Sequence, residues 1–300
     1  MPHANANGLE IYYESHGPET AEPILLIMGL GAQMSRWSPE LIGELTGAGH
    51  RVIAFDNRDV GLSGKLDAAG APDMHAVVLA LRDGKKPAVA YTLDDMAADA
   101  AGLLDALGVE RAHIVGASMG GMIAQLVAAD YPHKTLSLTS IMSTTGNPGL
   151  PRATPEALAR LNTPAPDPEK NLEGFLDHAV EGARVMASRY PPDEAAVRAR
   201  SLDDFRRCYY PVGFQRQYAG VMASPDRRPK LATITAPTVV IHGDADPLVP
   251  LEGGRDTAAN IPAAELIIVP GVGHEMPPAV LGVFVDGILS AIARSKVSAS

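Results

Sequence analysis

The stretch AHIVGASMGG, residues 112–121, decides the fold of this chain. Ala112–Val115 is a short apolar run that predicts a buried strand, and Met119–Ala129 predicts a helix rich in small residues. Between them stands a Gly-x-Ser-x-Gly pattern centred on Ser118. Its glycines permit a tight turn that presents the serine hydroxyl outward. The pattern alone is weak evidence, but its place between a strand and a helix is typical of a nucleophile elbow.

Apolar runs on both sides of this turn alternate with helical segments. Further strands are expected at Leu9–Tyr13, Ile24–Met28, Arg51–Phe55, Leu136–Met142, Thr238–His242 and Glu265–Val269. Helices are expected over Pro39–Ala48, from the capping residue Thr92 to Leu107, and over Pro278–Ala293. This alternation predicts an α/β protein with a mostly parallel sheet and helices on both faces.

Residues 146–229 interrupt the alternation. They are rich in Pro, Ala, Arg and acidic residues, with helical segments at Asn171–Met186 and Pro192–Tyr209. We interpret residues 146–229 as a helical cap, or lid, inserted between two strands. Residues 1–145 and 230–300 would then form the core domain.

Composition restricts the class of protein. The chain has 300 residues, of which 46% are hydrophobic and 20% charged, as in a globular protein with a sizeable core. Acidic residues outnumber basic ones by 35 to 25, so the net charge of −10 argues against a nucleic-acid partner. Cys208, the single cysteine, allows no internal disulfide. The N-terminal segment lacks the features of a secretory signal, and no apolar run reaches membrane-spanning length, so we expect a cytoplasmic protein without membrane insertion.

A serine nucleophile needs a base and an orienting carboxylate. His274 lies in a glycine-rich loop after the last expected strand, at the carboxyl edge of the sheet beside Ser118. Two carboxylates, Asp244 and Asp246, follow the penultimate strand at the same edge, and either could orient the histidine. Catalysis also requires two donors for the oxyanion, for which we expect the backbone N–H groups of Leu30 and Met119.

The chain lacks the motifs of the common nucleotide-binding and metalloprotease sites. The loop after Met28 faintly resembles a dinucleotide fingerprint, but Met34 occupies the third glycine position. The run Gly61–Lys65 is too short for a phosphate-binding loop, and the sequence has no His-Glu-x-x-His pattern. We therefore expect no cofactor and no metal.

Five motifs together resemble the α/β-hydrolase superfamily across the chain from Leu9 to the C-terminal helix. They are MGLG at 28–31, DNRDVGLS at 56–63, GASMGG at 116–121, GDADPLVP at 243–250 and GVGH at 271–274. The chain has Met-Gly where the superfamily commonly has His-Gly at the oxyanion strand. In this feature it resembles the aclacinomycin methylesterase-like carboxylesterases. The resemblance implies the α/β-hydrolase fold, with an eight-stranded sheet and a late helical lid, and assigns the acid to Asp246.

The resemblance implies a serine hydrolase that cleaves carboxylic esters of small or medium, largely apolar substrates through an acyl-enzyme. The same triad could instead serve a cofactor-free perhydrolase (haloperoxidase), a lactonase or a carbon–carbon bond hydrolase. A non-catalytic ligand receptor of the same fold is the alternative from another class.

The substrate pocket is less defined by sequence. Candidates for its wall are Trp37 after the oxyanion loop and Tyr209, Tyr210 and Phe214 in the lid, although packing explains Trp37 at least as well and each lid residue better. We expect a small-molecule ester as the partner and a monomer or homodimer as the assembly. Arg58 and Asp59 are expected to hold a neighbouring loop through a polar network.

Overall fold

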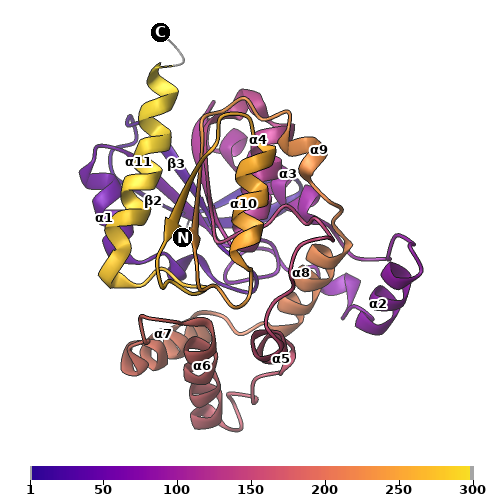
Figure 1. Cartoon of the computed structure of the whole chain (residues 1–300). Helices are drawn as coiled ribbons and strands as arrows, with labels where there is room; N and C mark the ends of the chain where they lie inside the picture. The colour runs from indigo at the N-terminus through magenta and orange to yellow at the C-terminus, as the bar shows by residue number, and fades with distance from the viewer. Residues whose placement is uncertain (1, 298–300) are drawn as a thin grey trace.

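The computed structural model describes residues 2–297 and is built around one eight-stranded sheet (Figure 1). The strand order is β1-β2-β4-β3-β5-β6-β7-β8; β1 and β2 run antiparallel to their neighbours, and β3 to β8 are parallel. The strands are β1 His3–Ala6, β2 Leu9–His16, β3 Pro23–Ile27, β4 Arg51–Phe55, β5 Ala112–Ala117, β6 Thr135–Ile141, β7 Thr238–Gly243 and β8 Glu265–Val269. The predicted α/β-hydrolase fold with a mostly parallel, eight-stranded sheet is confirmed.

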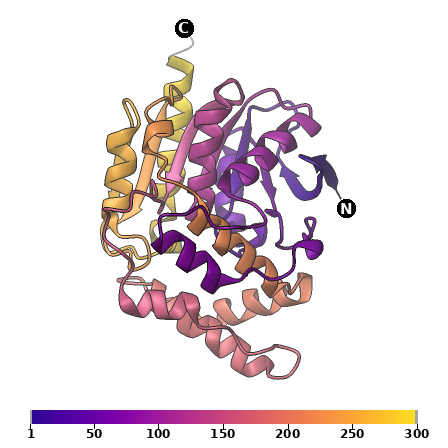
Figure 2. The same cartoon turned by 90° about the vertical axis from the view of Figure 1, so that its right-hand side faces the viewer.

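Helices cover both faces of the sheet. Helices α1 and α11 pack on one face, and α3 and α4 pack on the other (Figures 1 and 2). The helices are α1 Pro39–Gly47, α2 Met74–Arg82, α3 Leu93–Ala106, α4 Met119–Asp130, α5 Pro155–Asn162, α6 Leu172–Met186, α7 Glu194–Arg207, α8 Pro211–Ala223, α9 Arg228–Leu231, α10 Leu251–Asn260 and α11 Leu281–Val297. Short 3-10 turns lie at Met34–Arg36, Asp67–Ala69, Pro132–Lys134 and Pro278–Val280.

The central strands and α3 follow directly from the sequence pattern. Strands β5 and β7 are buried along their whole length, as expected of parallel strands covered on both faces. Helix α3 begins after Thr92 in a capping box, because the Thr92 backbone N–H donates to Asp95 Oδ2 at 2.8 Å. The sequence pattern does not predict β1, whose four residues HANA alternate poorly and form a strand by pairing with β2.

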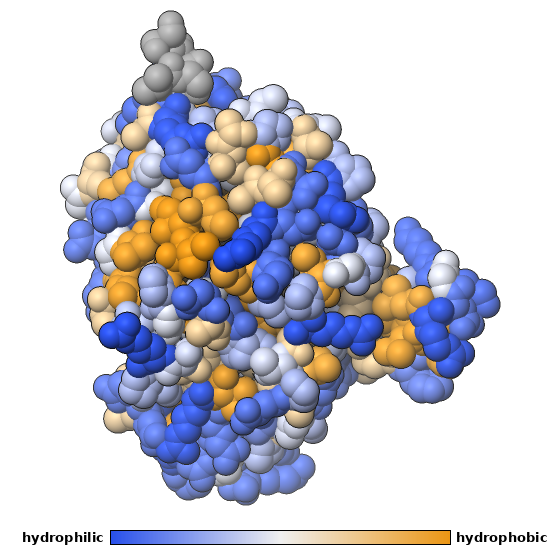
Figure 3. Space-filling view, in the orientation of Figure 1, coloured by the Kyte–Doolittle hydropathy of each residue, from blue (hydrophilic) through white to orange (hydrophobic). Residues whose placement is uncertain are grey.

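Helix α11 corrects the expectation that no apolar segment reaches membrane-spanning length. With the preceding turn it gives Pro278–Lys296, a segment long and apolar enough by length and composition alone to cross a membrane. In the fold, Phe284, Ile288 and Ile292 from this helix are at most 3% exposed and belong to the core beneath the sheet. Figure 3 shows hydrophobic residues gathered between α11 and α10, over the edge strand β8, where Ile268 is 38% exposed.

Helices α5 to α8 occupy the predicted insertion between β6 and β7. They lie beyond the carboxyl edge of the parallel strands; α5, α6 and α7 are at the bottom of Figure 1, and α8 lies above α5. The sequence pattern indicates α6 and α7 but not α5 or α8. Both of the missed helices begin at a proline, Pro155 and Pro211, a residue that suits the first position of a helix but interrupts a helical pattern.

Buried ion pairs join this insertion to the loop after β4. The Arg216 guanidinium donates to both carboxylate oxygens of Asp59, at 2.7 and 2.8 Å, and Arg207 lies 2.7 Å from Asp56 Oδ2. Arg58 pairs with Asp99 on α3 through two bonds of 2.6 Å. The expected polar network around Arg58 and Asp59 is therefore present, and it includes two arginines from the lid.

Candidate active site

Ser118 stands in a strained turn between β5 and α4. Its φ of 56° and ψ of −121° lie in a region that side chains with a Cβ rarely adopt. The turn is possible because its glycines allow backbone segments to touch. A Cβ on Gly116 would lie 2.0 Å from the Gly120 carbonyl oxygen, and a Cβ on Gly120 would lie 2.0 Å from that of Ile27. This packing presents the Ser118 hydroxyl at the carboxyl edge of the sheet.

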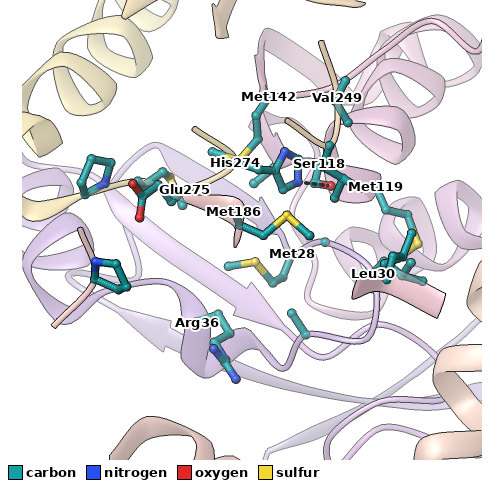
Figure 4. Close-up of a pocket in the computed structure, with 18 of the residues that line it drawn as sticks. Met28, Leu30, Arg36, Ser118, Met119, Met142, Met186, Val249, His274 and Glu275 are labelled. Carbon is teal, nitrogen blue, oxygen red and sulfur yellow. Dashed lines mark hydrogen bonds between the residues drawn. The ribbon is translucent and has the colours of Figure 1, made fainter. Parts of the chain in front are cut away.

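His274 reaches Ser118 from the loop after β8. Its Nε2 lies 2.9 Å from Ser118 Oγ, and its Nδ1 lies 2.7 Å from Asp246 Oδ2. Figure 4 shows the imidazole ring facing Ser118 within the cavity. The His274 backbone N–H donates to the Met186 carbonyl at 2.8 Å, so the lid helps to position this loop. The structure thus brings the three predicted residues into one hydrogen-bonded chain.

Asp246 and Asp244 have different roles in the loop after β7. The Asp246 side chain is fully buried, and its Oδ1 accepts the backbone N–H groups of Leu248 and Val249 at 2.9 and 2.8 Å. This leaves Oδ2 aligned with His274. Asp244 instead accepts the Gly271 N–H at 2.6 Å and braces the histidine loop. Of the two carboxylates that spacing left open, the structure brings only Asp246 to the histidine.

A second histidine lies behind the carboxylate. His242 Nε2 bonds the Val249 carbonyl at 2.8 Å and lies 3.7 Å from Asp246 Oδ2. Burial lowers the pKa of His242, which favours its neutral form. The negative charge of Asp246 is therefore directed toward His274.

The loop at Leu30 passes directly over the elbow. A Cβ on Gly29 would lie 3.2 Å from Ser118 Cβ, so a larger residue there would press on the serine. Asn57 donates to the Met28 carbonyl at 2.9 Å, and the Gly31 N–H donates to Gln217 at 2.8 Å. Sequence reasoning missed these two braces, which hold the loop in a chain that lacks the usual His-Gly.

The backbone N–H groups of Leu30 and Met119 are available for a ligand. Within residues 2–297 neither group donates a hydrogen bond, and both residues line the same cavity as Ser118. Met119 opens α4, so its N–H also carries the positive end of the helix dipole. Two such donors beside a serine can stabilise a developing oxyanion.

The cavity beside Ser118 has a volume of about 710 Å³. Six of the eleven methionines line it, namely Met28, Met119, Met122, Met142, Met186 and Met276. Methionine side chains are flexible and polarisable, so a wall built from them adapts to apolar groups of different shape. A cavity of this size and character accommodates a largely apolar small molecule.

Glu275 introduces a carboxyl group into this lining, and sequence reasoning did not identify it. Burial raises its pKa to about 7, although the Ser188 backbone N–H partly opposes the shift. Its Oε1 is buried and has no hydrogen-bond partner among the described residues. Figure 4 shows the Glu275 side chain at the edge of the cavity, on the side of His274 away from Leu30.

The four residues expected to wall the pocket do not line this cavity. Trp37 is 2% exposed and packs in the core beneath the sheet. Tyr209, Tyr210 and Phe214 line a separate cavity of about 220 Å³ between the lid and the Gly31–Gln33 loop. Tyr209 is there part of an aromatic cluster with two lid phenylalanines, so packing within the lid explains its position.

A serine at a strand–helix elbow, bonded to a histidine and a buried aspartate at the carboxyl edge of a parallel sheet, defines a hydrolase of the α/β type. Residues 22–277 match the family model described as alpha/beta hydrolase fold, and the chain belongs to this family.

Similar proteins match most of the chain. Rhodomycin D methylesterase of Streptomyces peucetius is 29% identical over 298 residues, covering 90% of each chain. The 2-hydroxy-6-oxononadienedioate/2-hydroxy-6-oxononatrienedioate hydrolase of Burkholderia vietnamiensis is 29% identical over 273 residues, covering 89% of this chain and 85% of its own. The enol-lactonase of Burkholderia xenovorans superposes with a TM-score of 0.71 at 22% identity, covering 97% of this chain and 100% of its own. The protein is a hydrolase, and its sequence is similar to that of a methylesterase.

Proposed function

We propose that this hydrolase cleaves carboxylic esters of small or medium, largely apolar substrates. The observation that carries the proposal is the aligned chain from Ser118 Oγ through His274 to Asp246, which opens into the methionine-rich cavity. The similarity to a methylesterase supports an ester as the substrate class.

Acyl transfer would begin at Ser118. As its Oγ attacks the acyl carbon, His274 Nε2 accepts the hydroxyl proton across the 2.9 Å contact. Asp246 accepts the Nδ1–H of the ring, which keeps Nε2 directed at the serine and stabilises the imidazolium that forms. The two amides to Asp246 Oδ1 keep this carboxylate from rotating away.

The tetrahedral intermediate would be held by the N–H groups of Leu30 and Met119. These donors are fixed by the backbone before the substrate arrives, so they need no reorganisation as charge develops. The alcohol then leaves with the proton from His274, and an acyl group remains on Ser118 Oγ. A water molecule attacks this ester with His274 as the base, and collapse of the second intermediate releases the acid and restores the serine.

The test is hydrolysis of p-nitrophenyl esters from acetate to dodecanoate by the wild type and by Ser118→Ala, with EDTA present. We expect turnover by the wild type and a loss of at least about a thousandfold in the variant. The chain length with the highest kcat/KM would measure how much of the cavity the acyl group fills. Ser118→Ala should still bind a slowly hydrolysed ester, because it removes only the nucleophile.

Three outcomes would contradict the proposal. Ester turnover that survives Ser118→Ala would place the chemistry elsewhere. Absence of turnover on every ester would contradict the choice of ester substrates. The wild type and Ser118→Ala would then be compared on lactones, in peracid formation and in carbon–carbon bond cleavage. Ligand binding without any turnover would favour a receptor.

A further inference from the structure

A second cluster of chemically active side chains lies at the amino edge of the parallel strands, opposite the lid in Figure 1. Glu22 directly precedes β3, His50 directly precedes β4, and His113 is the second residue of β5. These strands are neighbours in the sheet, and the pairings of Pro23 with Arg51 and of Ile24 with His113 bring the three side chains together. One nitrogen or oxygen from each residue lies within 4.8 Å of the other two.

Both histidines of the cluster are buried, and two polar atoms of the cluster lack a well-aligned hydrogen bond. His113 is 0% exposed and His50 is 6% exposed, whereas the Glu22 side chain is 36% exposed. His113 Nε2 and Glu22 Oε2 face each other at 3.0 Å, yet within residues 2–297 neither atom has a partner with hydrogen-bond geometry. A buried imidazole nitrogen without a well-aligned hydrogen bond is costly, so an atom in this position favours a ligand.

The other nitrogen of each ring is already used. His113 Nδ1 lies 2.8 Å from Ser137 Oγ, and His50 Nδ1 lies 3.2 Å from the Glu22 carbonyl oxygen. A carbonyl oxygen can only accept, so His50 Nδ1 carries the proton and its Nε2 keeps a lone pair. Metal-binding histidines are usually oriented in this way, with one nitrogen bonded to an outer partner and the other on the metal.

We propose that Glu22, His50 and His113 form a binding site for a divalent transition-metal ion of the zinc type. Two imidazoles and one carboxylate are a ligand set that suits Zn²⁺, and solvent would supply the fourth ligand. Atoms bound tetrahedrally at roughly 2.0–2.1 Å from the metal lie closer together than 4.8 Å, so the partly exposed Glu22 side chain would move inward. The ion would fasten the starts of β3, β4 and β5 to one another.

Lys296 of α11 competes with the metal for the same oxygen. Its ammonium lies 3.5 Å from Glu22 Oε2, and its side chain is 61% exposed. An exposed lysine can turn into solvent at little cost, so the metal would displace it rather than be excluded. The competition provides a variant that should gain affinity, since Lys296→Gln removes the charge without removing a ligand.

The experiment is titration of the tag-free full chain with ZnCl₂ in a calorimeter, after treatment with EDTA and removal of the chelator. We expect one zinc per chain. Glu22→Gln and His50→Gln should weaken binding more than about tenfold, and Ser137→Ala, which removes only the outer partner of His113, should weaken it about 10- to 100-fold. Lys296→Gln should bind more tightly than the wild type. His75→Gln, which alters an exposed histidine on α2, is the matched control and should bind like the wild type.

Three further readouts keep the result independent of folding defects. Circular dichroism without metal shows whether each variant is folded, and zinc at 100 times its Kd should raise the wild-type Tm by roughly 5 °C. Anomalous scattering at the zinc edge should give a peak between Glu22, His50 and His113. Absence of zinc binding, a peak elsewhere, or equal affinity in a folded Glu22→Gln variant would overturn the proposal.

Discussion

Each edge of the sheet places a histidine beside a carboxylate, but the two pairs differ in how their remaining atoms are used. At the carboxyl edge, Asp246 gives one oxygen to two backbone amides and the other to His274, whose second nitrogen meets Ser118. At the amino edge, His113 and Glu22 face each other without a hydrogen bond. A histidine and a carboxylate therefore orient a catalytic base at the edge where each of their polar atoms has a hydrogen-bond partner. They form a potential metal-ligand set at the edge where the two facing atoms lack a well-aligned hydrogen bond.

The largest expected effect is the loss of kcat on substitution of Asp246, because the position of this carboxylate orients the His274 ring. Asp246→Asn should keep the fold but lose the charge that selects the His274 tautomer, so kcat should fall by about 10³ to 10⁴. The measurement is kcat for p-nitrophenyl butyrate. Asp244→Asn is the matched control, since the Asp244 side chain bonds the Gly271 amide and not the histidine ring, and it should retain activity within about tenfold. Equal losses in both variants would remove the distinction between the two aspartates.

The next effect concerns the ion pair that fastens the lid to the carboxyl edge. Arg216 is fully buried and donates to both oxygens of Asp59. Burial raises the pKa of Asp59, but the bonds from Arg216, the Leu66 amide and Tyr91 outweigh it and hold the pKa below its ordinary value. Arg216→Met would leave this carboxylate buried without its cation, and the free energy of unfolding should fall by about 3–5 kcal/mol.

Urea denaturation measures this loss. Arg198→Met is the control on the neighbouring helix α7, where the partly exposed Arg198 pairs with the exposed carboxylates of Asp177 and Glu173. Its unfolding curve should coincide with that of the wild type, because surface pairs contribute little. A similar shift in both variants would show that the lid depends on charge in general rather than on the buried pair.

The sequence alone predicts where a residue lies when that residue directly follows or precedes a strand. Ser118, Asp246 and His274 each follow a strand, and the carboxyl ends of parallel strands share an edge, so their proximity follows from the chain order. The Asp246 assignment also needed the family resemblance, because spacing allowed Asp244. Glu22, His50 and His113 each lie at the start of a strand, and the same argument applied to the amino edge would have located them.

The lid could not be predicted in the same way. Its helices pack by contacts between segments far apart in sequence, such as Arg216 with Asp59, and no local pattern decides which aromatic side chain faces Ser118. Tyr209 packs among lid aromatics, whereas Met186 from the end of α6 reaches the cavity. Glu275 was overlooked because its unusual environment arises only after the His274 loop packs against the lid.

A third prediction compares the stability cost of a Gly→Ala substitution at the carboxyl edge, where the backbone is closely packed, with the cost at the amino edge, where the glycine faces open space. Gly120→Ala would place a Cβ 2.0 Å from the Ile27 carbonyl oxygen, and because backbone cannot yield cheaply we expect destabilisation of about 3 kcal/mol or more. Gly108 precedes β5 with a φ of +65°, and a Cβ added there would meet no described atom within 4 Å. Gly108→Ala should therefore cost only about 1–2 kcal/mol for the backbone conformation. Urea denaturation compares them, and equal costs would contradict the steric explanation.

The smallest expected effect is a change in the pH dependence of stability on substitution of Glu275, whose Oε1 has no hydrogen-bond partner among the described residues. The pKa of Glu275 is raised by burial from 4.5 to about 7, so between these pH values the unfolded chain releases the proton and the folded chain keeps it. Wild-type stability should therefore fall as pH rises through this window, whereas Glu275→Gln has no proton to lose. Since the side chain is partly exposed, we expect the variant to match the wild type at pH 4 and to be more stable by about 1 kcal/mol at pH 8. Thermal unfolding at both pH values measures the difference. A gain that is equal at pH 4 and pH 8 would mean that Gln simply packs better, and that the unpartnered Oε1 carries no electrostatic cost.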